Sequence, residues 1–185
     1  GGTSVFAGTT NGCVTISGET PPATPTVTPT PTQTPPPGRT VYLDLDPTNA
    51  FVAKDDIFPI DIRVIAGSQP VDGVEVHLDF NPLYLQVVDG SGNPASTISG
   101  SGVLNFEIQN NATNSAGQID FAAGTFGTPP SGTFVLATIR FKALWGTGGS
   151  CTPLTFVARG GSPTDVTHGG TSVFAGTTNG CVTIS

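Results

Sequence analysis

Charged side chains are scarce in this sequence, and basic ones are the scarcest. Only 10% of the 185 residues are charged, and 6 Lys and Arg stand against 13 Asp and Glu, which gives a net charge of −7. A protein with that field repels polyanions, and no basic stripe is present, so nucleic acid is a poor partner. No apolar run is long enough to cross a bilayer, and the first residues lack the charged and apolar regions of a signal peptide. We therefore expect a mature or internal fragment that contains no membrane span.

Catalytic motifs are also missing. The sequence contains no Gly-x-Ser-x-Gly nucleophile elbow, no phosphate-binding loop and no His-Glu-x-x-His helix. Its two histidines, His77 and His168, have no metal-binding motif around them, and we expect His77 to be a solvated strand residue. We assign no catalytic residue and no metal ligand, and the sequence does not indicate an enzyme.

Four acidic residues are the one possible exception to the absence of a metal site. Asp44, Asp46, Asp55 and Asp56 are predicted to gather at one end of the fold. Carboxylate oxygens of this kind can bind calcium, although a solvated turn is the simpler interpretation.

Glycine, proline and threonine are abundant, with 25 Gly and 17 Pro. This composition is typical of secreted β-rich proteins, whose turns need these residues. A chain of this length has room for one well-buried domain. From residue 39 onward, apolar and polar residues alternate with period two, which predicts strands. Nine such segments are expected, at residues 41–45, 58–64, 74–80, 83–87, 104–108, 119–123, 135–143, 154–156 and 182–184. The predicted fold is a nine-stranded antiparallel β-sandwich over residues 39–185.

A long identical repeat links the two ends of the chain. Residues 1–17, GGTSVFAGTTNGCVTIS, recur without change as residues 169–185. Either the segment was duplicated deliberately, or the chain begins with the last strands of a preceding unit in a natural tandem array, which we favour. Since residues 169–185 already complete this domain, we expect the first copy to complete a neighbouring one. Val14 and Ile16 would then point inward there, as Val182 and Ile184 do here.

Between the first copy and the domain lies a linker, residues 18–38, in which Pro and Thr nearly alternate. Proline fixes φ and favours extended geometry in the preceding residue, so this segment is predicted to be a stiff polyproline II spacer reaching roughly 65 Å. Its threonines are candidate O-glycosylation sites, and Asn111-Ala112-Thr113 is an N-glycosylation sequon. The candidate residues are Asn111, Thr26, Thr28, Thr30 and Thr32.

The chain has three cysteines, but a complete repeat unit has an even number of them, because Cys13 and Cys181 occupy the same position in successive copies. Each unit then owns Cys151 and Cys181, which fits one disulfide formed in an oxidising compartment. The bridge is expected at an edge of the sandwich, where it would join the last strand to the one before it and add roughly 3 kcal/mol. Cys13 would pair within the preceding repeat. Unpaired thiols are the alternative.

The sequence resembles the cohesin modules of bacterial cell-surface proteins over about residues 41–184. The resemblance rests on Val52-Ala53-Lys54-Asp55-Asp56, on residues 71–85 (VDGVEVHLDFNPLYL), on residues 132–141 and on the closing residues 179–184 (NGCVTI). It implies a nine-stranded jelly roll that binds a calcium-loaded dockerin on one outer sheet face. Glu75, His77 and Asp79 lie on the strand that contributes to this face in cohesins.

Three functions remain open at this point. The leading hypothesis is a structural repeat unit of an extracellular fibre or stalk on the cell surface, joined to neighbouring copies of itself by Pro/Thr linkers. The second is a cohesin module that binds a dockerin-like partner. The third, a carbohydrate-binding module, is weakened because sugar binding usually needs exposed aromatics, and the chain has only Trp145, Tyr42 and Tyr84 besides phenylalanine.

Overall fold

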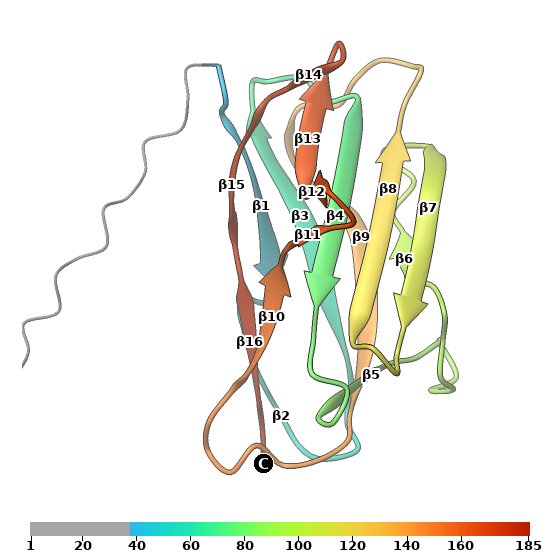
Figure 1. Cartoon of the computed structure of the whole chain (residues 1–185), viewed down its shortest axis with the longest axis vertical. Helices are drawn as coiled ribbons and strands as arrows, with labels where there is room; N and C mark the ends of the chain where they lie inside the picture. Colours follow the sequence, from blue (N-terminus) through green and yellow to red (C-terminus); the bar gives the residue numbers. More distant parts are fainter. Residues whose placement is uncertain (1–37) are drawn as a thin grey trace, which may run out of the picture. The chain divides into compact units, whose positions relative to one another are not determined.

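A computed structural model of the chain describes residues 38–185. The segments assigned to the first copy of the repeat and to most of the linker, including Cys13, Val14, Ile16 and the linker threonines, lie outside the described residues. Residues 38–185 form a two-layered β-sandwich, shown face-on in Figure 1. Within these residues, no helix has the length and apolar character needed to cross a membrane.

The first sheet has the order β15-β1-β3-β9-β5, with β6 also paired to β9. Its strands are β1 (Val41–Asp46), β3 (Ile57–Gly67), β5 (Leu85–Val87), β6 (Ser99–Gly100), β9 (Gly132–Ala143) and β15 (Phe174–Thr178). The long antiparallel pairing of β3 with β9 is its central element.

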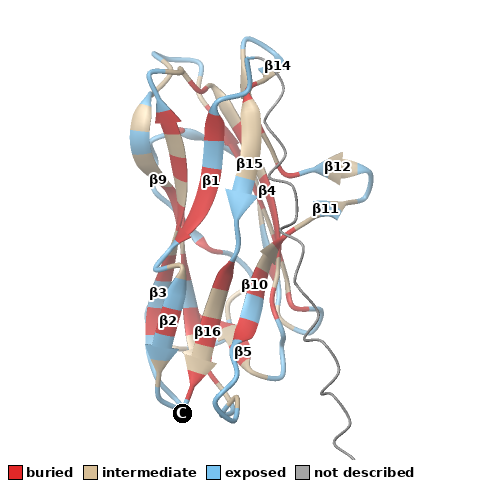
Figure 2. Cartoon of the chain, turned by 90° about the vertical axis from the view of Figure 1, so that its left-hand side faces the viewer, coloured by how far each residue is buried: buried red, intermediate tan, exposed pale blue. Residues whose placement is uncertain are grey.

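The second sheet has the order β14-β13-β4-β10-β16-β2, and β8 and β7 extend it from the other side of β4. Its strands are β2 (Asn49–Val52), β4 (Gly73–Asp79), β7 (Phe106–Thr113), β8 (Gln118–Gly124), β10 (Thr152–Phe156), β13 (Asp165–His168), β14 (Thr171–Ser172) and β16 (Gly180–Ile184). A separate small hairpin consists of β11 (Ala158–Arg159) and β12 (Ser162–Pro163). Figure 2 shows this hairpin projecting away from the two layers.

The core lies between the sheets and is built by the alternating rows that the sequence predicts. Successive side chains of a strand point to opposite faces, so every second residue can be apolar and fully buried. The inward rows of β1, β3 and β4 illustrate this, since most of their members have no exposed surface. They are Val41, Leu43, Leu45, Phe58, Ile60, Ile62, Val64, Val74, Val76 and Leu78.

All nine predicted strands exist, but the total of nine is wrong because the domain contains sixteen strand segments. The additional ones, among them β2, β13 and β15, are short and carry no extended alternation. The sheets are also mixed rather than purely antiparallel, since β15 runs parallel to β1 and β16 runs parallel to β2. The parallel pairs arise because two segments run side by side. One consists of β1 followed by β2 and the other of β15 followed by β16, and each passes from the first sheet into the second.

Several residues predicted to face the core do not. Leu83 is exposed because it lies in the turn before β5. In the strands, Phe106 and Ile108 are exposed, and Val135 is half-buried. Both β7 and β9 contain a register shift, between Glu107 and Gln109 in β7 and opposite Ile62 and Arg63 in β9. A bulge inserts one residue and breaks the period of two, so the parity of a row changes along the strand.

The C-terminal tail, residues 169–185, is an integral part of the sandwich. It supplies β14, β15 and β16, and it buries Val173, Val182 and Ile184. Figure 2 shows β15 and β16 following one another, with β1 beside β15, and β2 and β10 on either side of β16. Removing this segment would therefore open both sheets.

Candidate functional site

The outer face of β13, β4, β8 and β7 contains the partner-face residues that the sequence singles out. Figure 1 shows these four strands side by side, with β3 and β9 of the other sheet behind them. On β4, Glu75, His77 and Asp79 alternate with the buried core row and so point away from the core. Their partners across the β4–β8 ladder include Ala122 and Asp120, which share this outer face. We call this surface the outer face of β4.

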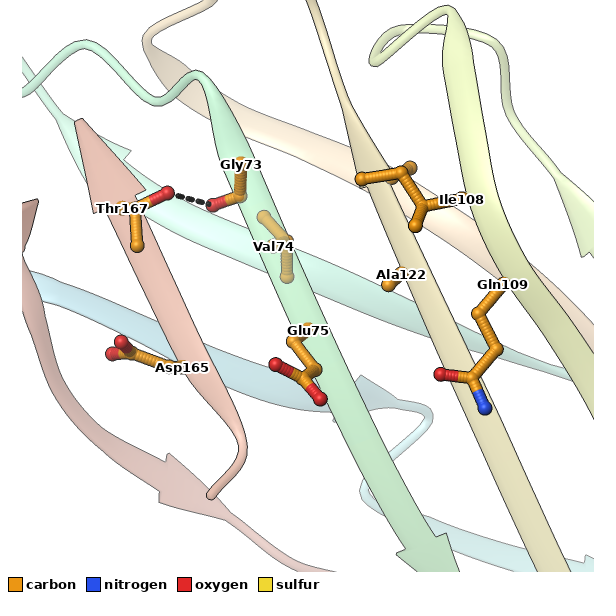
Figure 3. Close-up of a pocket in the computed structure, with 9 residues that line it drawn as sticks. Gly73, Val74, Glu75, Ile108, Gln109, Ala122, Asp165 and Thr167 are labelled. Carbon is orange, nitrogen blue, oxygen red and sulfur yellow. Dashed lines mark hydrogen bonds between the residues drawn. The ribbon is translucent and has the colours of Figure 1, made fainter. Parts of the chain in front are cut away.

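A hollow of about 290 Å³ lies on this face, across β13, β4, β8 and β7. Its lining residues are Gly73, Val74, Glu75, Ile108, Gln109, Ala122, Ala123, Asp165 and Thr167. Figure 3 shows the carboxylates of Glu75 and Asp165 on one side and Ile108 on the other. Small residues keep the hollow open: a Cβ added to Gly73 would lie 2.6 Å from the Thr167 hydroxyl oxygen. The hollow therefore combines an acidic side with an apolar side.

The apolar side continues as an exposed cluster formed by Phe106, Ile108 and Phe126. Their exposed fractions are 50%, 66% and 89%. The two phenylalanine rings are tilted against each other with centroids 5.3 Å apart. Isolated exposed apolar residues are ordinary, whereas a group of large ones beside a hollow is typical of an interaction surface. Sequence reasoning placed Phe106 and Ile108 in the core, so it missed this cluster.

His77 is not the solvated residue that the sequence predicts. It is only 5% exposed, and both of its ring nitrogens face carboxylates: Nδ1 lies 2.6 Å from Oδ1 of Asp120, and Nε2 lies 3.0 Å from Oε1 of Glu75. Because a carboxylate can only accept hydrogen bonds, the ring satisfies both at once only when both nitrogens are protonated. The prediction failed because neighbouring elements cover this position of the outward row.

Arg159 completes the polar cluster from the β11–β12 hairpin. Its guanidinium group forms ion pairs with both Asp79 and Asp120, and it also donates to the carbonyl of Ile119 at 3.3 Å. A hydroxyl bridge anchors the base of the hairpin, because the buried Thr164 accepts from the backbone nitrogen of His77 at 2.9 Å and donates to the carbonyl of Val157 at 3.0 Å. The hairpin is thus tied to β4 and β8 by charge-assisted contacts.

Of the predicted partner-face residues, the structure brings Glu75, His77 and Asp79 into this one network. The side chains of Glu75 and Asp79 are 37% and 47% exposed, so they remain accessible to a partner. His77 is too buried for direct contact with a partner; its ring instead contacts Glu75 and Asp120, while Asp79 is paired with Arg159. The face carries a local excess of carboxylates over cations.

The four aspartates considered for calcium are placed apart. Asp44 and Asp46 both form ion pairs with Arg63 on the first sheet, and the hydrogen bond from Arg63 to Asp44 raises the pKa of the guanidinium group. Asp55 and Asp56 lie in the turn between β2 and β3, where Asp56 accepts from the backbone nitrogen of Ala53 at 2.8 Å. Residues 38–185 hold no group of three or more His, Cys, Asp or Glu positioned for a metal ion.

Cys151 and Cys181 form a disulfide with a Cα separation of 5.7 Å. It joins the start of β10 to β16, as the sequence predicts. On its far side Cys181 pairs with Asn49 of β2, whereas the pairing of β10 with β4 is confined to Thr155 and Phe156, away from Cys151. Asn111 of the sequon is exposed on β7.

Comparison with known proteins identifies the fold. No family model matches the sequence, and no curated protein is significantly similar to it. Several solved structures resemble the domain at low sequence identity, and three of them follow. A type II cohesin domain from the cellulosome of Acetivibrio cellulolyticus has a TM-score of 0.62 and 16% identity, over 77% of this chain and 94% of that one. A non-cellulosomal cohesin from Archaeoglobus fulgidus has a TM-score of 0.59 and 17% identity, over 78% and 91%.

The third is a type II cohesin–X–dockerin complex from Acetivibrio cellulolyticus, with a TM-score of 0.57 and 17% identity over 78% of this chain and 94% of the matched one. Together these similarities establish that the domain has the cohesin-like jelly-roll fold that the sequence predicts.

Proposed function

We propose that this domain is a non-catalytic protein-interaction module that binds a dockerin-like partner through the outer face of β4. The observation that carries the proposal is the exposed Phe106–Ile108–Phe126 cluster beside the acid-lined hollow. Interface centres are enriched in aromatic and large apolar side chains, and polar rims surround them. The similarity to a cohesin that was solved in complex with a dockerin favours this class of partner.

Ile108 is the residue that best tests the proposal, because it lines the hollow and belongs to the apolar cluster. Ile108→Asp places a charge where the partner would bury apolar surface. It should weaken binding of a dockerin-like domain from the same genome by at least about tenfold, or ~1.4 kcal/mol. Isothermal titration calorimetry in the presence of calcium measures this change.

Tyr42→Asp is the matched control, since Tyr42 is 41% exposed on the outer side of the first sheet. The control should bind as tightly as the unaltered protein. If the Ile108→Asp protein binds as tightly as the unaltered protein, or if only the Tyr42→Asp protein loses affinity, the interface lies on another surface.

A second function, that of a structural repeat unit in an extracellular fibre or stalk on the cell surface, is favoured by the identity of residues 1–17 and 169–185. In the described domain this segment supplies three strands and one disulfide cysteine. A copy of it, with Val14 and Ile16 in the places of Val182 and Ile184, is suited to complete a neighbouring sandwich. Contacts of this head-to-tail kind do not close and so propagate into filaments. The two functions are compatible, because residues 169–185 supply no residue of the exposed cluster and none of the lining of the hollow.

The repeat hypothesis predicts the sequence beyond Ser185. There the full protein should continue Gly-Glu-Thr-Pro-Pro, as it does after Ser17, because residues 1 and 169 are 168 positions apart. Sequencing the complete gene settles this point. A unique sequence after Ser185 would rule out the array and leave the interaction module as the sole proposal.

A further inference from the structure

Two further exposed aromatic side chains belong to the segments that flank the end of the last strand. Phe51 on β2 is 80% exposed, and Trp145, in the loop after β9, is 57% exposed. The ammonium group of Lys54 lies 4.9 Å from the centroid of the Trp145 ring. Among the described residues, Lys54 forms no ion pair with a carboxylate. We call Phe51, Lys54 and Trp145 the Trp145 platform.

The platform surrounds the point where β16 ends. The backbone nitrogen of Lys54 donates to the carbonyl of Ser185 at 3.0 Å, and the backbone nitrogen of Ser185 donates to Val52 at 3.0 Å. On the opposite side, the backbone nitrogen of Thr147 donates to the carbonyl of Ile184 at 2.9 Å. A Cβ on Gly146 would lie 3.8 Å from the carbonyl carbon of Ser185. Any chain that continues from Ser185 therefore starts between Lys54 and the Trp145 loop.

The identical tail shows which sequence follows this point in a tandem repeat. Ser17 is the counterpart of Ser185, and it is followed by Gly18-Glu19-Thr20-Pro21-Pro22. We propose that the Trp145 platform binds the copy of this Pro/Thr-rich segment that follows Ser185 as it leaves the domain. The counterpart of Glu19 in that copy would pair with Lys54, and the counterparts of Pro21 and Pro22 would pack against the aromatic rings. The proposal rests on the repeat function above, and it adds a docking site that fixes the direction of the linker.

Charge and chemistry both favour this occupant. Glu19 is the only acidic residue in residues 1–38, and it comes two positions after the counterpart of Ser185. At about 3 Å per residue in an extended chain, its carboxylate stays within reach of the Lys54 side chain. Proline-rich segments bind on exposed aromatic surfaces because their polyproline II geometry is already formed and little entropy is lost. A linker held this way would orient successive domains rather than let them swivel.

The experiment uses the fact that Trp145 is the only tryptophan of the chain. The full chain is extended beyond Ser185 by a second copy of residues 18–38, and a matched protein carries a Gly/Ser segment of the same length. The Pro/Thr extension should shift the Trp145 emission to the blue and reduce its quenching by acrylamide. Equal emission and quenching in the two proteins would overturn the proposal.

Lys54→Gln in the Pro/Thr-extended protein should restore much of the quenching, whereas Lys142→Gln, which alters a lysine on β9, should not. Unchanged thermal unfolding of both variants confirms that the fold is intact. Protection that grows with protein concentration would instead assign the platform to a second copy of the chain and contradict the proposal. Because the extension is added by design, failure here leaves the repeat hypothesis itself to be judged by the gene sequence.

Discussion

His77, on the outer face of β4, shows how much of a single residue's environment the sequence can predict. His77 alternates with the core row and was expected in solvent, yet it is buried between Glu75 and Asp120. Alternation determines which side of the sheet a residue faces, but it does not show what covers that side. Arg159 forms an ion pair with Asp120, whose carboxylate His77 contacts, and it lies 82 positions after His77 on a hairpin of two short strands. Such long-range contacts have no local signal in the sequence.

His77→Ala should destabilise the domain by about 2 kcal/mol, because two partly buried carboxylates would lose their shared donor. Chemical denaturation monitored by circular dichroism measures the change in unfolding free energy. The control is His168→Ala, since the side chain of His168 is 39% exposed and its Nδ1 lies 3.4 Å from a carboxylate oxygen of Asp72. That change should cost less than about 0.5 kcal/mol. Similar losses in both proteins would show that the His77 network does not stabilise the fold.

At the scale of elements, the long strands were predictable and the short ones were not. Strands such as β3, β4 and β9 carry three or more alternating apolar residues, which is the signal that period-two patterns provide. By contrast, β15 reads Phe-Ala-Gly-Thr-Thr and β13 reads Asp-Val-Thr-His, and neither has an apolar row. Their pairing depends on neighbours that are distant in sequence. For the same reason the parallel pairing of the first and last strands could not be predicted.

The apolar cluster on β7 shows a second limit. Leu104, Phe106 and Ile108 form a row with period two, but only Leu104 is buried. An apolar row looks the same in sequence whether it faces the core or a partner. The bulge in β7 then shifts the register, so parity with the inward residues of β8 is lost. The sequence thus predicted the apolar part of the candidate binding surface wrongly, as a part of the core.

The disulfide could be predicted from the sequence because the prediction needed only the number of cysteines in each repeat. It ties β16 to β10 across a separation of 30 residues. Cys151→Ala with Cys181→Ala should lower the unfolding free energy by about 3 kcal/mol, mainly because the unfolded chain gains freedom. Denaturation of this double variant, beside the unaltered protein with and without a reductant, measures the loss. An unchanged midpoint after both treatments would contradict a stabilising role.

At the scale of the whole molecule, the two proposed surfaces lie on different parts of the domain and have different proposed roles. The exposed cluster and acidic hollow lie on β7, β8, β4 and β13, whereas the Trp145 platform surrounds the end of β16. Binding at the first surface leaves the second available for the linker. A module arranged in this way could be repeated along a stalk while each copy presents its own binding face.

Hydrogen exchange of the domain with and without a calcium-loaded dockerin-like domain from the same genome tests the central claim most directly. The account predicts slower exchange in Gly73–Asp79 and Phe106–Thr113, the strands that carry the acids and the apolar cluster. Exchange in Val41–Asp46 and Ile57–Gly67 of the first sheet should not change. Protection confined to those two strands, or no protection by any such partner, would contradict the assignment of the outer face of β4 as the binding surface.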